Sequence, residues 1–394
     1  MNRKKLSLAV LAAAIALPPS MAAATGGAVK AGAQAVSPKA QLGRLMYFDR
    51  GLSEPAGQAC ASCHDPARAF VDPDRRAVTS KGAISPLVGS RNTPTSMYMA
   101  FSPRFHWDEK EALYLGGQFW DGRAASLEEQ AKGPLLNPLE MANPHGRALV
   151  GKVRRAAYAP EFDRVFGKDA LKDDDKAFER VAEALAAFQR TPQFAPFSSK
   201  YDAYLAGKAK LSKREMRGLR LFEAEDKGNC AACHPSRPGP KGEPPLFTDF
   251  SYDNLGVPRN PDNPFYRLPA QYNPVGEAFV DRGLGGALGK PSEDGKFKVP
   301  TLRNIAVTGP YMHNGYFRTL PGLLDFYNSR DTRPPCDSSQ VREAEAQKRQ
   351  CWPVPEVINN VNKDELGDLK LTRREREDIL AFMETLSDGW QPKR

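Results

Sequence analysis

Long apolar runs are scarce in this sequence, which limits where a membrane could hold the chain. The one extended run, residues 6–17, follows the basic residues 3–5 and is broken by two prolines. It is too short to span a bilayer, and the small residues 22–24 behind it form a cleavage signal. Residues 1–24 are therefore predicted to be a secretory signal peptide, with an uncleaved anchor as the alternative. No later stretch approaches the ~18 apolar residues of a span, so we expect a soluble mature protein in the periplasm, without a transmembrane anchor.

Charge of one sign is also in small excess. The formal net charge of +9 falls to +6 without the three basic residues of the signal peptide. Such an excess is not the footprint of a nucleic-acid-binding protein, so no nucleic-acid partner is expected; at most it helps to steer an acidic redox partner. The 34 prolines predict long loops over a helical frame, hence a mostly α fold with few regular strands.

Histidine and cysteine are rare, with five and six copies, yet most of them occur in two short motifs. The motifs are Cys60-Ala-Ser-Cys63-His64 and Cys230-Ala-Ala-Cys233-His234. Two thiols at this spacing reach one edge of a haem and add to its vinyl groups, and the following histidine then lies under the iron as proximal ligand. The sequence therefore predicts two covalent haem c groups, with His64 and His234 as iron ligands.

Zinc binding and a thioredoxin-like redox pair are the alternatives for these motifs. The wide separation of the motifs along the chain weakens zinc, and a redox pair leaves both histidines unexplained. Two further cysteines, Cys336 and Cys351, lie outside the motifs. An even remainder in an exported protein indicates a disulfide, which we expect between these two residues.

The chain shows signs of two copies of one haem-binding plan. An amphipathic stretch that ends in an aromatic residue precedes each motif, at residues 42–48 and 217–222. A second sign of repetition is the similarity of residues 91–94 to residues 301–304. Two copies of one haem-binding plan are the economical explanation.

A helix is predicted at residues 176–190, where apolar side chains share one face, and another at residues 372–386 behind a capping box. The irregular stretch after the first helix marks a boundary, so the predicted domains are residues 25–195 and 196–394. Residues 235–300 are dense in proline, glycine and asparagine. We interpret them as an ordered long loop around the second motif, with disorder as the alternative.

Three histidines lie outside the motifs. His106 and His145 are expected to be surface or satisfied core residues, because a lone histidine usually is. His313 lies in a tight polar turn and is a candidate contact for a haem edge.

Four further stretches carry a family resemblance: Phe-Trp-Asp-Gly-Arg-Ala at 119–124, the Leu-Glu-Glu-Gln to Leu-Glu-Met segment at 127–141, Val-Pro-Thr-Leu-Arg-Asn at 299–304 and Thr-Gly-Pro-Tyr-Met-His-Asn-Gly at 308–315. Together they resemble the bacterial cytochrome c peroxidase/MauG family, in the family's order and over nearly all of the mature chain. The resemblance implies a mostly α fold of two cytochrome c-like haem domains with long loops, with a peroxidatic haem in the N-terminal domain and an electron-transfer haem in the C-terminal domain.

The resemblance also implies catalytic residues. The family's distal Gln and Glu match Gln130 and Glu140, and a tryptophan between the haems matches Trp120. A buried carboxylate can move a proton between the two oxygens of a peroxide, which suits the chemistry. The plainer alternatives are that Glu140 is a turn carboxylate and that Trp120 is a core aromatic.

A calcium ion between the domains is implied at Asn92, Thr308 and Pro310, which match the family's binding positions. Amide and backbone carbonyl oxygens are suitable ligands for this hard cation. Ordinary polar loop positions are the alternative.

Three departures from family patterns bear on the subfamily. Members that need reductive activation carry a blocking histidine after the first haem motif, whereas no histidine occurs here between His64 and His106. The distal ligand of the second haem is a methionine in the peroxidases and a tyrosine in MauG-like members, and this chain has Tyr327 there, with a core tyrosine as the alternative. MauG has a tryptophan two residues before its second motif, where this chain has Gly228, so the resemblance does not carry over the methylamine dehydrogenase precursor as substrate.

The resemblance, with these departures, predicts a periplasmic dihaem peroxidase of the MauG-like branch. It would reduce hydrogen peroxide without reductive activation, using electrons from a small redox protein (a cytochrome c or a cupredoxin) or from an oxidisable protein substrate. The alternative from another class is a dihaem electron-transfer cytochrome without turnover. Such a carrier would normally fill both sixth iron positions, and no candidate ligand is visible for the first haem.

Overall fold

A computed structural model describes residues 36–392, so the predicted signal peptide lies outside the described residues. Helices predominate, in agreement with the mostly α expectation. The longer helices are α1 (Pro38–Tyr47), α3 (Leu127–Leu136), α4 (Gly146–Arg155), α5 (Ala159–Phe166), α6 (Asp174–Gln189), α8 (Lys213–Glu223), α10 (Leu320–Ser329) and α12 (Arg373–Glu384). The shorter ones are α2 (Cys60–Cys63), α7 (Lys200–Leu205), α9 (Gly283–Leu288) and α11 (Glu343–Arg349).

Regular strands are few and short. β1 (His106–Asp108) pairs antiparallel with β2 (Leu113–Leu115), and β3 (Tyr252–Asp253) pairs antiparallel with β4 (Phe297–Lys298). In the second pair Tyr252 lies opposite Lys298. These two short strand pairs contribute little to the architecture, which the helices and the loops between them determine.

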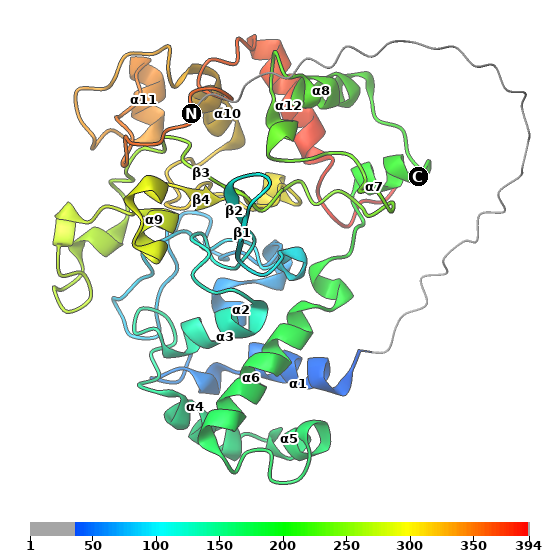
Figure 1. The fold of residues 1–394 in the computed structure, drawn as a ribbon, viewed down its shortest axis with the longest axis vertical. Coiled ribbons are helices and arrows are strands. Elements are labelled where there is room, and N and C mark those ends of the chain that lie inside the picture. Colours follow the sequence, from blue (N-terminus) through cyan, green and yellow to red (C-terminus); the bar gives the residue numbers. More distant parts are fainter. Residues whose placement is uncertain (1–35, 393–394) are drawn as a thin grey trace, which may run out of the picture. The chain divides into compact units, whose positions relative to one another are not determined.

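Two pairs of helices pack in the same way, through a glycine at the crossing. α1 packs on α6, and α8 packs on α12, as Figure 1 shows. The first helix of each pair carries a glycine at the crossing: a Cβ at Gly43 would collide with the Ala184 carbonyl, and one at Gly218 with the Asp378 carbonyl. The absence of a side chain therefore lets each lead-in helix approach its partner closely.

The sequence located these helices to within a few residues. The predicted helix at 176–190 is α6, and the helix predicted at 372–386 is α12, whose N-terminus is capped by Thr372 and Glu375 as expected. The amphipathic stretches before the two motifs lie in α1, which begins before the residues singled out, and in α8, whose N-terminus is the capping box that the pattern Ser212-Lys-Arg-Glu215 predicts.

Apolar side chains gather into two main clusters. One draws on α1, α3, α4 and α6 and contains Phe162, Phe188 and Phe194; the other draws on α8, α10 and α12 and contains Phe222, Phe326 and Phe382. The first cluster ends at Phe197, apart from Leu246, and the second begins at Tyr201. Backbone contacts do not separate the clusters into different units, so the domain boundary at residue 195 stays a prediction.

The loop-rich stretch 235–300 is ordered by its own asparagines. The amides of Asn254, Asn260, Asn263 and Asn273 are buried, and each donates to a backbone carbonyl, at 2.8–3.1 Å. Side-chain amides thereby replace the backbone pairing that an irregular segment lacks. The expectation of an ordered loop is confirmed, although α9, β3 and β4 within it were not expected.

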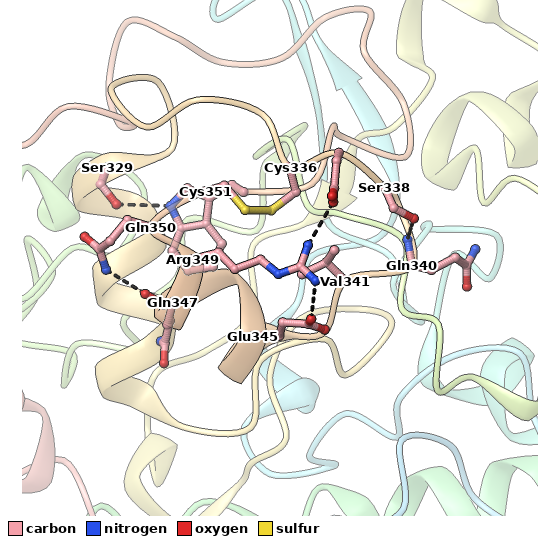
Figure 2. Close-up of a disulfide and its surroundings, with 12 residues drawn as sticks. Ser329, Cys336, Ser338, Gln340, Val341, Glu345, Gln347, Arg349, Gln350 and Cys351 are labelled. Atoms are coloured by element: carbon pink, nitrogen blue, oxygen red, sulfur yellow. Dashed lines mark hydrogen bonds and ion pairs between the residues drawn. A yellow bond between two sulfur atoms is a disulfide. The ribbon is translucent and has the colours of Figure 1, made fainter.

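The predicted partners Cys336 and Cys351 lie at bonding distance, beside α11 (Figure 2). Arg349 of α11 pairs with Glu345 at 2.5 Å and with Asp337 at 2.9 Å on the same side of the loop. Within residues 36–392, no helix is both long and apolar enough to cross a membrane.

Candidate functional site

The histidine of the first motif is held by two neighbours. His64 follows α2, and its Nδ1 lies 2.9 Å from the Phe70 carbonyl oxygen and 2.9 Å from the Ser96 hydroxyl. Since a carbonyl oxygen only accepts, Nδ1 carries the proton and donates, which leaves Nε2 with a lone pair for a metal. Burial lowers the pKa of His64 and so favours the neutral ring that ligation requires.

The second histidine is held in the same way. His234 Nδ1 donates to the Phe247 carbonyl at 2.7 Å, and burial lowers the pKa of His234 to about 4. Phe70 and Phe247 have φ angles of 56° and 54°, a left-handed conformation that a bulky residue adopts only under constraint. Both turns therefore accept the same backbone strain where a carbonyl is aimed at the histidine.

The structure corrects the predicted alignment of residues 91–94 with residues 301–304. Thr95 accepts from Met97 N and donates to the Ala69 carbonyl at 2.6 Å, while Thr301 accepts from Arg303 N and donates to the Leu246 carbonyl at 2.6 Å. Thr95 thus corresponds to Thr301, and residues 91–94 do not correspond to residues 301–304. Each threonine fastens the residue before the strained phenylalanine, so the repeat is defined by what its side chain holds.

The four motif cysteines are half-buried. Burial raises the pKa of Cys60, Cys63 and Cys230 to about 12, and that of Cys233 above its usual range. Zinc ligands and redox pairs require thiolates, which an electropositive setting normally stabilises. These thiols lack that setting, which fits addition to haem vinyl groups better than either alternative.

One cavity of about 570 Å³ joins the two motifs. Its lining includes almost all the predicted site residues: Cys63, His64, Asn92, Trp120, Gln130, Glu140, Cys230, Cys233, His234, Thr308, Pro310 and Tyr327. Cys60 alone of the set is outside the lining, one helical turn from Cys63 in α2. The chain therefore presents two metal-ready imidazoles and both pairs of thiols around one enclosed space, a donor set that fits two haem groups.

Glu140 is fixed in a turn after α3. Its Oε1 accepts from Asn137 Nδ2 at 2.7 Å, and its carbonyl accepts from Ala83 N at 2.7 Å. Burial raises the pKa of Glu140, against the opposing effects of Asn137 and Arg123. Gln130 lies on α3 and faces the same cavity. A carboxyl group with a raised pKa and a neighbouring amide is an arrangement that can hold and move a proton.

Trp120 is linked through a backbone carbonyl to Asn92, one of the three predicted calcium residues. Trp120 Nε1 donates to the Asn92 carbonyl at 2.8 Å, and Asn92 N donates to the His313 carbonyl at 2.7 Å. Thr308 and Pro310 line the cavity together with Asn92. These oxygens are neutral, and residues 36–392 contain no group of three or more His, Cys, Asp or Glu side chains that could hold a metal ion.

Tyr327 lies on α10, which begins at the Thr319 cap and packs on α12. Burial raises the pKa of Tyr327 well above its usual range, and the thiols of Cys230 and Cys233 raise it further. The ring faces the cavity on the side of the second motif. A side chain at Gly228 would collide with the Leu221 carbonyl, so the backbone here has no room for a tryptophan.

The remaining histidines separate into different environments. His106 is exposed on β1 and bonds the Arg104 carbonyl, and His145 caps α4 by accepting from Ala148 N. Neither lines the cavity, which agrees with their plain interpretation. His313 is only 4% exposed, stacks on Phe297 at 3.6 Å and does line the cavity; its contact with a haem edge stays a prediction.

Sequence reasoning missed a charged cluster on the cavity wall. Arg91 bonds Asp281 at 2.7 and 2.8 Å and Asp121 at 2.6 Å, and Arg123 bonds Asp121 at 2.9 Å. Lys298 faces the same cavity. Arg91 lies in the repeated segment 91–94 and Arg123 in the family-like segment 119–124, so both were noticed without their charges being considered. No sequence pattern indicates that Lys298 is buried.

Comparison with known proteins places these features in context. A sequence model described as di-haem cytochrome c peroxidase matches residues 37–210. The methylamine utilization protein MauG of Paracoccus denitrificans is 42% identical over 89% of this chain and 88% of its own length. The cytochrome c551 peroxidase of Nitrosomonas europaea is 31% identical over 74% of both chains. The diheme peroxidase BthA of Burkholderia thailandensis is similar in structure, with a TM-score of 0.73 and 34% identity over 89% of this chain and 86% of that one.

Proposed function

The chain belongs to the di-haem cytochrome c peroxidase family, which includes MauG, and we propose that it reduces hydrogen peroxide at its first haem motif without prior reductive activation. As a family member it is a haem oxidoreductase with two haem groups. The observation that carries the proposal is the single cavity that brings both motif histidines together with Glu140 and Gln130.

His64 and His234 would each hold an iron through Nε2, and the four motif cysteines would attach the haems as thioethers. When bound, the haems supply iron centres that exchange electrons with peroxide and with a donor. The net reaction takes two electrons and two protons into one hydrogen peroxide to give two waters. The chain's own contribution is to place those protons and to admit the peroxide.

Glu140 is the residue that we assign to proton transfer. Asn137 occupies Oε1, so Oε2 is the oxygen that can take a proton from peroxide and return it to the departing oxygen. A raised pKa brings the carboxyl closer to the working pH, where such transfer is most effective. Gln130, on the adjacent helix, would orient the peroxide from the same side.

An open first site is what distinguishes the MauG-like mode. The histidines that line the cavity are His64, His234 and His313, and none comes from the segment after the first motif, where activated peroxidases carry the blocking residue. Ser80 of that segment bonds Asp72 and Thr93, which keeps the segment tied to its own half. We therefore assign the oxidised protein a first site that peroxide can enter.

We propose that Tyr327 would hold the iron of the second haem through its phenolate oxygen. A hard anionic oxygen lowers the reduction potential of a haem relative to a thioether sulfur. The second haem would then share oxidising equivalents with the first as well as pass electrons. We also assign a calcium ion to Asn92, Thr308 and Pro310, whose neutral oxygens suit a hard cation. It would join the Trp120 loop to the turn before His313.

The location and the partner complete the proposal. The predicted signal peptide supports the periplasm, and the electron source is a small redox protein or an oxidisable protein substrate. The relative in Paracoccus is named for methylamine utilization, but the backbone at Gly228 gives no support to the same protein substrate here.

The test is to mix fully oxidised holoprotein with hydrogen peroxide in a stopped-flow spectrometer, and then to repeat it after reduction by one electron. We expect a rapid optical change without prior reduction, and steady peroxide consumption when a reduced cytochrome c or cupredoxin is supplied. Reaction only after reduction would contradict the MauG-like mode. No peroxide consumption in either state would contradict the enzyme assignment and favour an electron-transfer cytochrome.

A further inference from the structure

Lys298 is a buried lysine that connects the two halves of the cavity wall. It lies on β4 and is 5% exposed. Its backbone N–H donates to the Trp120 carbonyl at 2.8 Å, and its Nζ donates to the Gly117 carbonyl at 2.6 Å. Both acceptors belong to the loop that carries Trp120, so the lysine approaches the tryptophan from main chain and side chain together.

The ammonium of Lys298 makes fewer hydrogen bonds than it has donors. It has three donors, and its only hydrogen bond within residues 36–392 is to Gly117. Asp121 is the acid that acts on it electrostatically, but Arg91 and Arg123 already engage both oxygens of that carboxylate. A buried charge without a counter-ion is costly. The site therefore calls for an anion, or for loss of the proton.

The charges nearest to Lys298 point the same way. Arg91 and Arg123 already hold Asp121 and Asp281 in ion pairs, and among the described acids that line the cavity, which also include Glu140, Asp253, Glu356 and Glu365, only Asp121 acts electrostatically on the Lys298 ammonium. Burial lowers the pKa of Lys298 to about 7, so a nearby negative charge is needed to keep it an ammonium at and above neutral pH. His313 and Glu356, which also line the cavity, lie 3.9 Å apart with their facing atoms unbonded to other described residues.

We propose that the Lys298 ammonium binds a propionate carboxylate of a haem in this cavity, beside Trp120. A haem carries two propionates on the edge away from its vinyl groups, so a haem fixed by thioethers at one end brings carboxylates to the other. The inference rests on the haem content of the proposed function and does not depend on peroxide turnover. Either haem can supply the carboxylate, and the experiment distinguishes between them.

The bound cation should raise the reduction potential of that haem. A positive charge beside the propionate favours the reduced iron, which carries one charge fewer, and its removal leaves an unbalanced carboxylate that favours the oxidised iron. Lys298→Met keeps the length of the side chain but removes the charge and the donors. Lys298→Arg keeps both. Lys81→Met is the matched control, because Lys81 lines the same cavity but is exposed.

The measurement is a spectroelectrochemical titration of the holoproteins, with haem content determined by pyridine haemochrome. We expect Lys298→Met to lower the midpoint potential of one haem, identified by its optical signature, with partial recovery in Lys298→Arg and no shift in Lys81→Met. Unchanged potentials in a fully loaded Lys298→Met protein would overturn the proposal and make Lys298 a neutral donor to Gly117.

A loading defect has its own outcome. If Lys298→Met yields no loaded protein, Lys298→Gln, which keeps an N–H donor without the charge, gives the same comparison. Loss of haem from both neutral variants but not from Lys298→Arg supports the proposal, and loss from all three counts against it. A wild type that consumes no peroxide would refute the proposed function, yet its titration would still decide the role of Lys298.

Discussion

Replacing Glu140 with glutamine isolates proton transfer from everything else that this residue does. Glutamine has nearly the same shape, and its amide oxygen can still accept from Asn137 Nδ2, the bond that measures 2.7 Å for the carboxylate. The backbone bonds to Ala83 and Asn137 do not involve the side chain. The variant should therefore keep the turn and both haem spectra, and lose only the ability to take up and return a proton.

The expected loss follows from the role. One positioned acid–base group typically contributes about 10²–10⁴-fold to a rate, which corresponds to about 2.7–5.4 kcal/mol in the barrier. Asn137 and Gln130 are neutral amides and cannot replace the lost base. We therefore expect Glu140→Gln to slow the reaction with peroxide at least a hundredfold.

The pH dependence provides a second measurement on the same variant. Burial raises the pKa of Glu140 above its usual range, and the form that accepts a proton is the carboxylate. The wild-type rate should therefore fall on acidification through this raised pKa, at a higher pH than an exposed glutamate would give. The acid limb should be absent in Glu140→Gln, whose side chain does not titrate.

The assay is stopped-flow mixing with excess peroxide, with the second-order rate constant measured across pH. Glu129→Gln is the control: it lies nearby on α3, is exposed and bonds Arg104 and the Ala125 amide outside the cavity. An unchanged rate constant in Glu140→Gln with intact spectra would refute the assignment. An equal loss in both variants would show that the effect comes from α3 and not from the carboxyl group.

Four further results are expected. Purified protein should contain two haems per chain that resist acid–acetone extraction, and a haemochrome assay that gives one or none would contradict this. Peptide mapping without reduction should join Cys336 to Cys351, and Cys336→Ser should lower the free energy of unfolding by about 3 kcal/mol, as the chain-entropy account gives for a loop of this size; free thiols at both positions would remove the claim. Tyr327→Phe should change the optical spectrum of the second haem only, and an unaltered spectrum would leave Tyr327 as a core residue. Chelation of calcium should alter the electronic coupling between the haems, measured as a change in their potentials; chelator-insensitive potentials would count against the ion.

A feature could be predicted from the sequence when it depends on residues that are close together in the chain. Helices α6 and α12 were predictable because each buries a periodic apolar face, and the capping box of α12 is written in four consecutive residues. The haem motifs were predictable because five consecutive residues carry the whole chemistry. None of these inferences needed to know what lies across the fold.

Features that depend on tertiary contacts were missed or misplaced. The short strands β3 and β4 pair only because loops far apart in the sequence meet, so no run of residues announces them. The two similar segments, residues 91–94 and 301–304, were misaligned because Thr95 and Thr301 resemble each other in the groups that they bind, while their sequence neighbours differ. Lys298 was overlooked because lysine is almost never fully buried, and only the fold shows it between Gly117 and the cavity.

The two halves share their frame but not the segments that surround it. Each frame consists of a lead-in helix packed on a later helix through a glycine, a strained phenylalanine whose carbonyl fixes the histidine, and a threonine that secures the phenylalanine. In the first half the segment between threonine and later helix carries α3 and the turn with Glu140, a proton-handling group. In the second half the corresponding segment carries α10 and Tyr327, whose phenol oxygen is the proposed iron ligand. Under the proposed function, a shared frame with different insertions would give one haem a site for substrate and the other a site for a ligand, so the roles of the haems would follow from the insertions and not from the motifs.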